Sequence, residues 1–177
     1  KLEEAEYMLR HVHEQFSRWL YPDDPNLLAN MNYLAVTLWL QGKPGNLVGA
    51  EGLVQRALEQ RSRQLGLGHP STTMPSLLTT MQILAVIKRD QGKLEEAEYM
   101  LRHVHEQFSR LYDPEDPRTL TNMTYLGVTL WRQGKLVELE GLLKQALEQR
   151  SRPLSPEHFS TIVQNLAATL HQQRKLE

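Results

Sequence analysis

A segment of eighteen residues, KLEEAEYMLRHVHEQFSR, occurs twice in this chain without a single difference, at residues 1–18 and 93–110. The similarity continues beyond the identical copies, because residues 21–43 return in diverged form at 113–135. Each half also resembles itself, so the underlying unit is about half of the long spacing, or somewhat over forty residues. Self-similarity at such a period is typical of architectures in which similar units stack on one another.

The spacing of apolar residues is helical. Met31, Leu34 and Leu38, for example, recur at intervals of three and four residues, and little of the chain alternates at period two. Proline is tolerated in the first turn of a helix and excluded from its interior. We therefore expect a helix boundary at each proline. The prolines are Pro22, Pro25, Pro44, Pro70, Pro75, Pro114, Pro117, Pro153 and Pro156.

Three equivalent Gln-Gly-Lys motifs predict tight turns. Their glycines, Gly42, Gly92 and Gly134, can adopt the left-handed conformation that ends a helix. Such turns join antiparallel helix pairs, and each helix has one apolar stripe that a neighbour must cover. The sequence thus predicts an all-α chain forming a single array over residues 1–177. The expected helices are at residues 2–20, 25–41, 46–63, 75–91, 94–111, 117–133, 136–152 and 159–173.

Composition excludes several classes of partner and cofactor. The 20 Lys and Arg residues are balanced by 21 Asp and Glu residues, so no net field favours nucleic acid or an anionic membrane. The absence of cysteine excludes disulfides, thiol catalysis and Cys-based zinc sites, and fits a cytoplasmic location. No apolar run reaches the roughly 20 residues that span a bilayer. The chain opens on a charged helix instead of a signal peptide, so we expect a fragment or a processed form.

The motifs DPRTLTNMTYLGVTLWRQGK and QGKLEEAEYMLR resemble the tetratricopeptide repeat, in the variant of about 42 residues found in kinesin light chains and many fungal proteins. The resemblance covers essentially the whole chain and implies a right-handed α-solenoid of about four antiparallel helix pairs. In this family a leucine–small pair lets the two helices of a repeat approach closely. The matching pairs are Leu34–Ala35, Leu84–Ala85, Leu126–Gly127 and Leu166–Ala167. The small residue that opens the second helix matches at Ala5, Ala50 and Ala97 and is replaced by Leu139.

Two departures from the family pattern concern the third repeat. Lys88 stands where the equivalent positions carry leucine, so we expect this repeat to be loosened or the lysine to extend its ammonium group to a polar surface. Residues 69–80 carry about five extra residues relative to the other repeats. Residues 158–167 are in turn about two residues short, and we expect the packing at these two junctions to be the least regular.

Enzymatic and metal-binding motifs receive little support. The HEQFS segments at His13 and His105 lack the second histidine of a zinc-protease helix. His11 and His13 are two residues apart on a helix and point to different faces, unlike a pair of metal ligands. No Ser–His–Asp set can be assembled from the sequence. We expect no catalytic residue, no metal and no cofactor.

The resemblance implies that the first helix of each pair lines a concave groove and contacts the ligand. One row of groove positions is uncharged and suited to binding the backbone of an extended peptide. This row is Asn32, Gln82, Thr124 and Gln164. The next row alternates aromatic and basic residues, and Trp and Arg are enriched at binding hot spots. It is Trp39, Arg89, Trp131 and His171. Alternatively, the two tryptophans are packing residues that close the contact between repeats.

The leading hypothesis is a non-enzymatic scaffold that binds a protein or an extended peptide. A structural subunit that assembles head to tail into a filament is the first alternative, and a sensor or regulatory segment of a larger protein is the second. The filament hypothesis rests on the first and last predicted helices, each of which lacks the partner that the other could provide. It predicts that Leu9 and Phe16 contact the helix of a neighbouring molecule that carries Ile162, Leu166 and Leu170.

Overall fold

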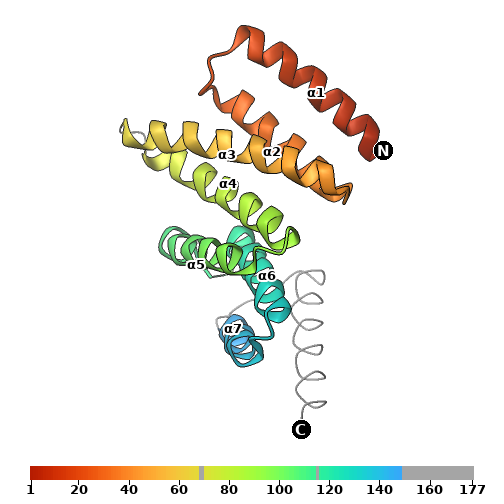
Figure 1. Cartoon of the computed structure of the whole chain (residues 1–177). Helices are drawn as coiled ribbons and strands as arrows, with labels where there is room; N and C mark the ends of the chain where they lie inside the picture. The colour runs from red at the N-terminus through yellow and green to blue at the C-terminus, as the bar shows by residue number, and fades with distance from the viewer. Residues whose placement is uncertain (68–69, 115, 149–177) are drawn as a thin grey trace. The chain divides into compact units, whose positions relative to one another are not determined.

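The computed structural model describes residues 1–67, 70–114 and 116–148, and all regular secondary structure in this part of the chain is helical (Figure 1). The helices are α1 (Leu2–Trp19), α2 (Pro25–Leu40), α3 (Pro44–Gly66), α4 (Pro70–Asp90), α5 (Leu94–Leu111), α6 (Pro117–Arg132) and α7 (Leu136–Glu148). The predicted all-α class is confirmed for these residues, whereas the helix predicted at 159–173 lies outside them. None of the described helices is long and apolar enough to cross a membrane.

The chain divides into two compact units, Lys1–Gly92 and Lys93–Glu177. Unit 1 contains α1 to α4, and the described part of unit 2 contains α5 to α7. The predicted glycine turns are present, since Gly42, Gly92 and Gly134 have φ values of 66°, 85° and 74°. The boundary between the units falls in the second of these turns. A single array over residues 1–177 stays a prediction.

Asp-Pro pairs begin two of the helices. The carboxylate of Asp24 accepts a hydrogen bond from the backbone N–H of Asn26 at 2.8 Å, and Asp116 accepts one from the N–H of Arg118 at 2.9 Å. The proline after each aspartate occupies the first helical turn, where its missing N–H removes no hydrogen bond. These starts agree with the boundaries that the prolines predict.

The start of α4 differs from the prediction. Pro75 is equivalent to the prolines that begin α2 and α6, but α4 begins at Pro70 and Pro75 lies inside the helix. Met74 stands where Asp24 and Asp116 cap the other two helices, so no capping side chain favours a helix start at this point. The helix therefore continues through the extra residues of this repeat, and Pro75 costs it one intrahelical hydrogen bond.

Within unit 1 each helix packs against the next in sequence, and α2 also contacts α4 (Figure 1). α3 is longer than its predicted range of 46–63 at both ends. The interior of the unit consists of aliphatic and small side chains. Its most deeply buried members are Leu28, Ala35, Ala50, Val54, Ala57, Leu78, Ala85 and Ile87. The leucine–alanine pairs expected to permit close approach of helices are thus buried in α2 and α4.

In unit 2, α5 packs against α6 and α6 against α7, and the second contact combines one unusually small residue with one unusually large one. A Cβ atom at Gly127 of α6 would lie 3.2 Å from Cδ1 of Leu139 on α7. The equivalent positions of α2 and α3 carry Ala35 and Ala50, both fully buried. Leu139 is therefore accommodated because its neighbour on α6 has no side chain.

This size exchange predicts energetic coupling between the two positions. Gly127→Ala improves helix propensity by about 1 kcal/mol but forces the new methyl group toward Leu139. In a Leu139→Ala background the methyl group has room, so we expect Gly127→Ala to be more favourable there by about 1–2 kcal/mol. Chemical denaturation of the wild type, the two single variants and the double variant measures this difference. An equal effect of Gly127→Ala in both backgrounds would contradict the coupling.

Candidate functional site

Asn32, the first residue of the uncharged row, is buried and links three helices of unit 1. Its Nδ2 donates a hydrogen bond to Oγ1 of Thr80 on α4 at 3.1 Å. Arg61 of α3 donates to the same hydroxyl, which in turn donates to the carbonyl oxygen of Ser76 at 2.8 Å. A buried amide must find an internal partner, and here the partner lies on the neighbouring helix. Asn32 therefore ties α2 to α4, whereas the groove hypothesis expects it to face a ligand.

The other members of the uncharged row are also engaged inside the protein or lie outside the described residues. Gln82 of α4 is buried. The hydroxyl of Thr124 donates to the carbonyl oxygen of Leu120 at 3.0 Å, within its own helix. Gln164 lies outside the described residues. Burial of Asn32 and Gln82 argues against contact between these two side chains and a peptide backbone.

The second row contains a compact polar cluster at the ends of α2 and α4. Nε1 of Trp39 donates to Oδ2 of Asp90 at 2.7 Å. Arg89 donates to the same carboxylate through Nε at 3.0 Å and Nη2 at 3.1 Å. Asp90 has no acidic counterpart, since the equivalent positions carry Leu40 and Arg132. The indole N–H of the half-buried Trp39 is thus engaged between α2 and α4, which favours the packing alternative. Contact of its ring with a ligand stays a prediction.

Trp131 of α6 is more accessible than Trp39. Its side chain is 44% exposed, and the exposed Arg132 follows it. The repeat pattern places the two tryptophans at equivalent positions, but the structure gives them different surroundings. His171, the last residue of this row, lies outside the described residues. Trp131 is therefore the member of the row best placed to meet a partner.

The structure adds an exposed apolar stripe on α2 that the sequence analysis did not identify. Tyr33 is 65% exposed and Leu40 is 54% exposed, with the half-exposed Val36 between them. The three residues follow the i, i+3, i+7 spacing that places side chains on one helix face. We refer to Tyr33, Val36 and Leu40 as the α2 stripe. The sequence could have indicated this stripe, because its three apolar residues do not lie on the helix face that carries Leu34 and Leu38.

A glutamine–glutamate hydrogen bond occurs twice in unit 1, where successive repeats meet. The glutamine of the Gln-Gly-Lys turn bonds a glutamate on the helix packed before it. The pairs are Gln41 with Glu6 and Gln91 with Glu51, with N–O distances of 2.7 and 2.8 Å. In unit 2 the amide atoms of the equivalent Gln133 are buried without a hydrogen-bond partner among the described residues, and Lys135 bonds Glu98 instead. Because the same atoms meet in both turns of unit 1, this bond sets the register of the helices there.

The carboxylates of Glu6 and Glu98 are stabilised in their charged form. Hydrogen bonds from Gln41 and then Arg10 lower the pKa of Glu6. Burial alone would raise the pKa of Glu98, but hydrogen bonds from Lys135 and Arg102 outweigh it and hold the pKa below its ordinary value. Nζ of Lys135 lies 2.6 Å from the Glu98 carboxylate.

Lys88 pairs with Glu51, the same glutamate that bonds Gln91. Its Nζ lies 3.3 Å from Oε1 of Glu51, and both side chains are largely buried. The lysine stem occupies the position of a core leucine, and its ammonium group reaches a carboxylate on α3. The sequence analysis expected either a loosened repeat or a lysine that extends its ammonium group to a polar group. The structure shows the second.

His13 of α1 and His105 of α5 occupy equivalent positions in the identical copies, and Nδ1 of each is buried without a hydrogen-bond partner among the described residues. Burial is the main cause that lowers the pKa of both imidazoles, and the charges of Arg56 and Arg102 act in the same direction on His13 and His105 respectively. In the part of the chain that the structure describes, no group of three or more His, Asp or Glu residues could hold a metal ion.

The Trp39–Asp90 hydrogen bond predicts a specific stability loss. Trp39→Phe keeps the aromatic ring and removes the donor, so the unfolding free energy should fall by about 1.5 kcal/mol, as for a hydrogen bond to a charged group. In an Asp90→Asn background the loss should be smaller, since the neutral amide is a weaker partner. Chemical denaturation of the four proteins measures both effects. Wild-type stability of Trp39→Phe would contradict the role of this bond.

The two half-buried histidines, His13 and His105, predict that stability falls on mild acidification. Their pKa values are lowered in the folded state, so the unfolded chain binds more protons below its ordinary pKa of 6.5. Stability should therefore decrease as the pH falls from about 7.5 through 6.5. The double variant His13→Gln/His105→Gln should show a flatter melting temperature across this range than the wild type. The exposed pair His11→Gln/His103→Gln is the matched control and should retain the wild-type slope.

The chain was compared with known proteins. The family model described as tetratricopeptide repeat matches residues 76–152. A search of curated protein sequences gave no significant match. Solved structures similar to the chain include a kinesin light chain protein of Podosopora anserina with nearly identical TPR-like repeats, at 21% identity and a TM-score of 0.78, covering 98% of this chain and 80% of that one.

Two further structures support the same fold. A point variant of the Podosopora anserina protein has 21% identity and a TM-score of 0.79, covering 98% of this chain and 79% of that one. BtubC (BKLC) from P. vanneervenii has 17% identity and a TM-score of 0.50, covering 98% of this chain and 90% of that one. The chain therefore has the fold of kinesin light chain-like tetratricopeptide repeat proteins, and residues 76–152 carry the sequence pattern of that repeat family.

Proposed function

We propose that this tetratricopeptide repeat scaffold binds extended peptide segments of partner proteins at two separate surfaces, the α2 stripe in unit 1 and Trp131 in unit 2. The α2 stripe carries the proposal, because exposed apolar side chains that share one helix face mark interaction sites. Binding requires no cofactor and no chemical step. Apolar and aromatic side chains of the peptide would occupy the stripe.

The hydrogen bonds between α2 and α4 support this proposal by fixing the surface in advance. Asn32 bonds Thr80 and Trp39 bonds Asp90, at points two turns apart on α2. A surface held in its binding conformation loses little entropy when a ligand docks. In this arrangement the buried polar residues position the wall, and the exposed apolar residues contact the ligand.

Selection of peptides from a phage-displayed random library on the full chain provides ligands with which to test the proposal. For a peptide that binds unit 1, Tyr33→Ala/Leu40→Ala should weaken binding about 10-fold or more, since truncation of a hot-spot residue typically costs over 1 kcal/mol. For a peptide that binds unit 2, Trp131→Ala should have this effect. Both changes remove exposed side chains, so circular dichroism and the melting temperature should stay close to wild type.

Val48 of α3 and Val137 of α7 provide matched controls, because both are exposed apolar residues on the second helices of their pairs. Val48→Ala and Val137→Ala should leave peptide affinity unchanged. Equal losses in the control variants, or full binding by Tyr33→Ala/Leu40→Ala and by Trp131→Ala, would refute the proposal.

Self-association is a second candidate function, favoured by a difference between the identical copies. In α5 the side chains of Ala97, Leu101, Val104 and Phe108 are fully buried, whereas α1 contains no fully buried residue. Leu9 and Phe16, the predicted contacts on α1, are half-buried, and Met8 is 65% exposed. Ile162, Leu166 and Leu170 lie outside the described residues. A second copy that covers α1 would bury the stripe that α5 buries.

Sedimentation across a range of protein concentrations tests self-association. The mass should rise with concentration for the wild type and rise less for Met8→Gln, which removes apolar surface from α1. The equivalent change in the other copy, Met100→Gln, is the matched control and should associate as the wild type does. A monomer at every concentration would exclude this candidate.

A further inference from the structure

Arg61 of α3 is a charged residue at a position where two equivalent helices carry an aromatic side chain. The equivalent residues are Phe16 of α1 and Phe108 of α5, and Phe108 is fully buried. Arg61 is only 7% exposed, so its side chain takes the place of a core ring. The fourth equivalent residue, Arg150, lies outside the described residues. A charge at such a position is costly unless a group of opposite charge compensates it.

The residue of α4 that bonds Arg61 also differs from its equivalents. These are Asn30 of α2 and Asn122 of α6, whose Nδ2 atoms donate to a backbone carbonyl of the preceding helix at 3.3 and 2.9 Å. In α4 the residue is Thr80, and its hydroxyl accepts a hydrogen bond from Nη1 of Arg61. The contacts of α1 with α2 and of α5 with α6 thus form with phenylalanine and asparagine. The repeat fold therefore does not require the Arg61–Thr80 pair.

Only one nitrogen of the Arg61 guanidinium is engaged within the described residues. Nη1 donates to the hydroxyl of Thr80 and to the carbonyl oxygen of Ser76, the latter at 3.2 Å. Nε and Nη2 form the edge with which arginine binds two oxygens of a carboxylate. In the described part of the chain they make no hydrogen bond, and neither is fully enclosed. The buried Arg89 uses the same edge on Asp90, at 3.0 Å from Nε and 3.1 Å from Nη2.

The other two cations buried on α4 are each balanced by a carboxylate. Nζ of Lys88 lies 3.3 Å from Glu51, and Arg89 pairs with Asp90. Arg61 has no ion pair within the described residues. Burial lowers the pKa of its guanidinium, and no carboxylate acts in the opposite direction. One negative charge placed at Nε and Nη2 would compensate this site.

We propose that Arg61, held in place by Thr80, binds a carboxylate group through Nε and Nη2. The carboxylate belongs to a small organic acid or to an acidic side chain of a partner protein. Its single charge balances one guanidinium, as Asp90 balances Arg89, whereas a phosphate dianion would leave a negative charge buried.

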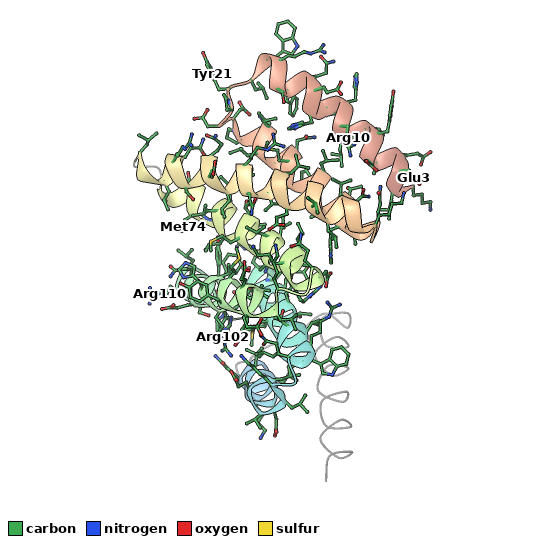
Figure 2. All side chains as sticks on the ribbon, viewed as in Figure 1. Glu3, Arg10, Tyr21, Met74, Arg102 and Arg110 are labelled. Atoms are coloured by element: carbon green, nitrogen blue, oxygen red, sulfur yellow. The ribbon has the colours of Figure 1, made fainter. Side chains whose placement is uncertain are left out.

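The site lies near the point where α3 passes into α4, and Figure 2 shows Met74 at this end of the two helices. It involves the second helix of a pair and includes no residue of the α2 stripe. The proposed peptide binding by the stripe and by Trp131 is therefore not required for it.

NMR of the arginine side chains tests the site directly. Sodium acetate, fully ionised at about pH 7.5, should shift the Nε–Hε resonance of Arg61 in a saturable manner when sodium chloride is reduced to keep the ionic strength constant. We expect a dissociation constant in the millimolar range or below. Arg61→Gln removes the charge and the paired donors, so it should weaken acetate binding about 10-fold or more. The exposed Arg63 provides the matched control, and Arg63→Gln should bind acetate as the wild type does.

The internal copies supply a second variant that keeps the packing. Arg61→Phe/Thr80→Asn gives α3 and α4 the residues of α5 and α6, so it should fold and should lose acetate binding. The capped peptide acetyl-Ala-Glu-Ala-amide, with its glutamine version as the control, distinguishes the two sources of the carboxylate. Binding tighter than that of acetate indicates an acidic side chain of a partner, and otherwise the ligand is a small organic acid.

Three results would overturn the proposal. The first is a wild-type chain whose Arg61 resonance shows no saturable shift with acetate. The second is acetate binding by Arg61→Gln or by Arg61→Phe/Thr80→Asn with wild-type affinity. The third is a site that binds sodium phosphate under the same conditions and does not bind acetate.

Discussion

Close approach of helices at small residues is the contact on which the packing within each unit depends. A helix with one apolar stripe is stable only when its neighbours cover the stripe, and they can do so only where a small side chain lets the backbones come near. Ala35 and Ala50 supply this in unit 1. Gly127 supplies it in unit 2, where Leu139 has replaced the second small residue. The missing side chain at Gly127 thus leaves room for the larger side chain of Leu139.

Polar contacts fix the register of the helices that pack through these apolar faces. Glutamine–glutamate bonds join two Gln-Gly-Lys turns to the preceding helix, as in Gln41 with Glu6 and Gln91 with Glu51. In unit 1 the pattern is extended by charged residues at core positions, since Lys88 reaches Glu51 and Arg61 reaches Thr80. A buried polar group without a partner is costly, so such residues favour one alignment of the helices over shifted ones. The central helices of unit 1 are thus fixed by direction-dependent bonds as well as by shape.

The sequence predicted the helices well and the surroundings of individual side chains poorly, for one physical reason. Helix starts and turns depend on local chemistry, such as the cap of Asp24 or the positive φ of Gly92, which the sequence displays. The missing cap at Met74 is displayed as well, and there it outweighs the proline, since Pro75 lies inside α4. By contrast, whether Trp39 faces a ligand or another helix depends on Asp90, fifty-one positions away. A repeat pattern cannot show such a difference, because it assigns equivalent residues the same role.

The two identical helices show how far context alone changes a side chain. Phe108 is fully buried, and its copy Phe16 is only partly covered, although the eighteen residues around them are the same. Identical sequence therefore fixes the amphipathic pattern of the helix but not the extent of burial, which depends on what packs against it. The reverse holds just beyond the identical copies, where the turn hydrogen bonds persist and the side chains differ. Residues that differ between copies with the same backbone, such as Trp19 and Leu111, are released from the requirements of folding and are therefore the positions at which one repeat can acquire a binding role of its own.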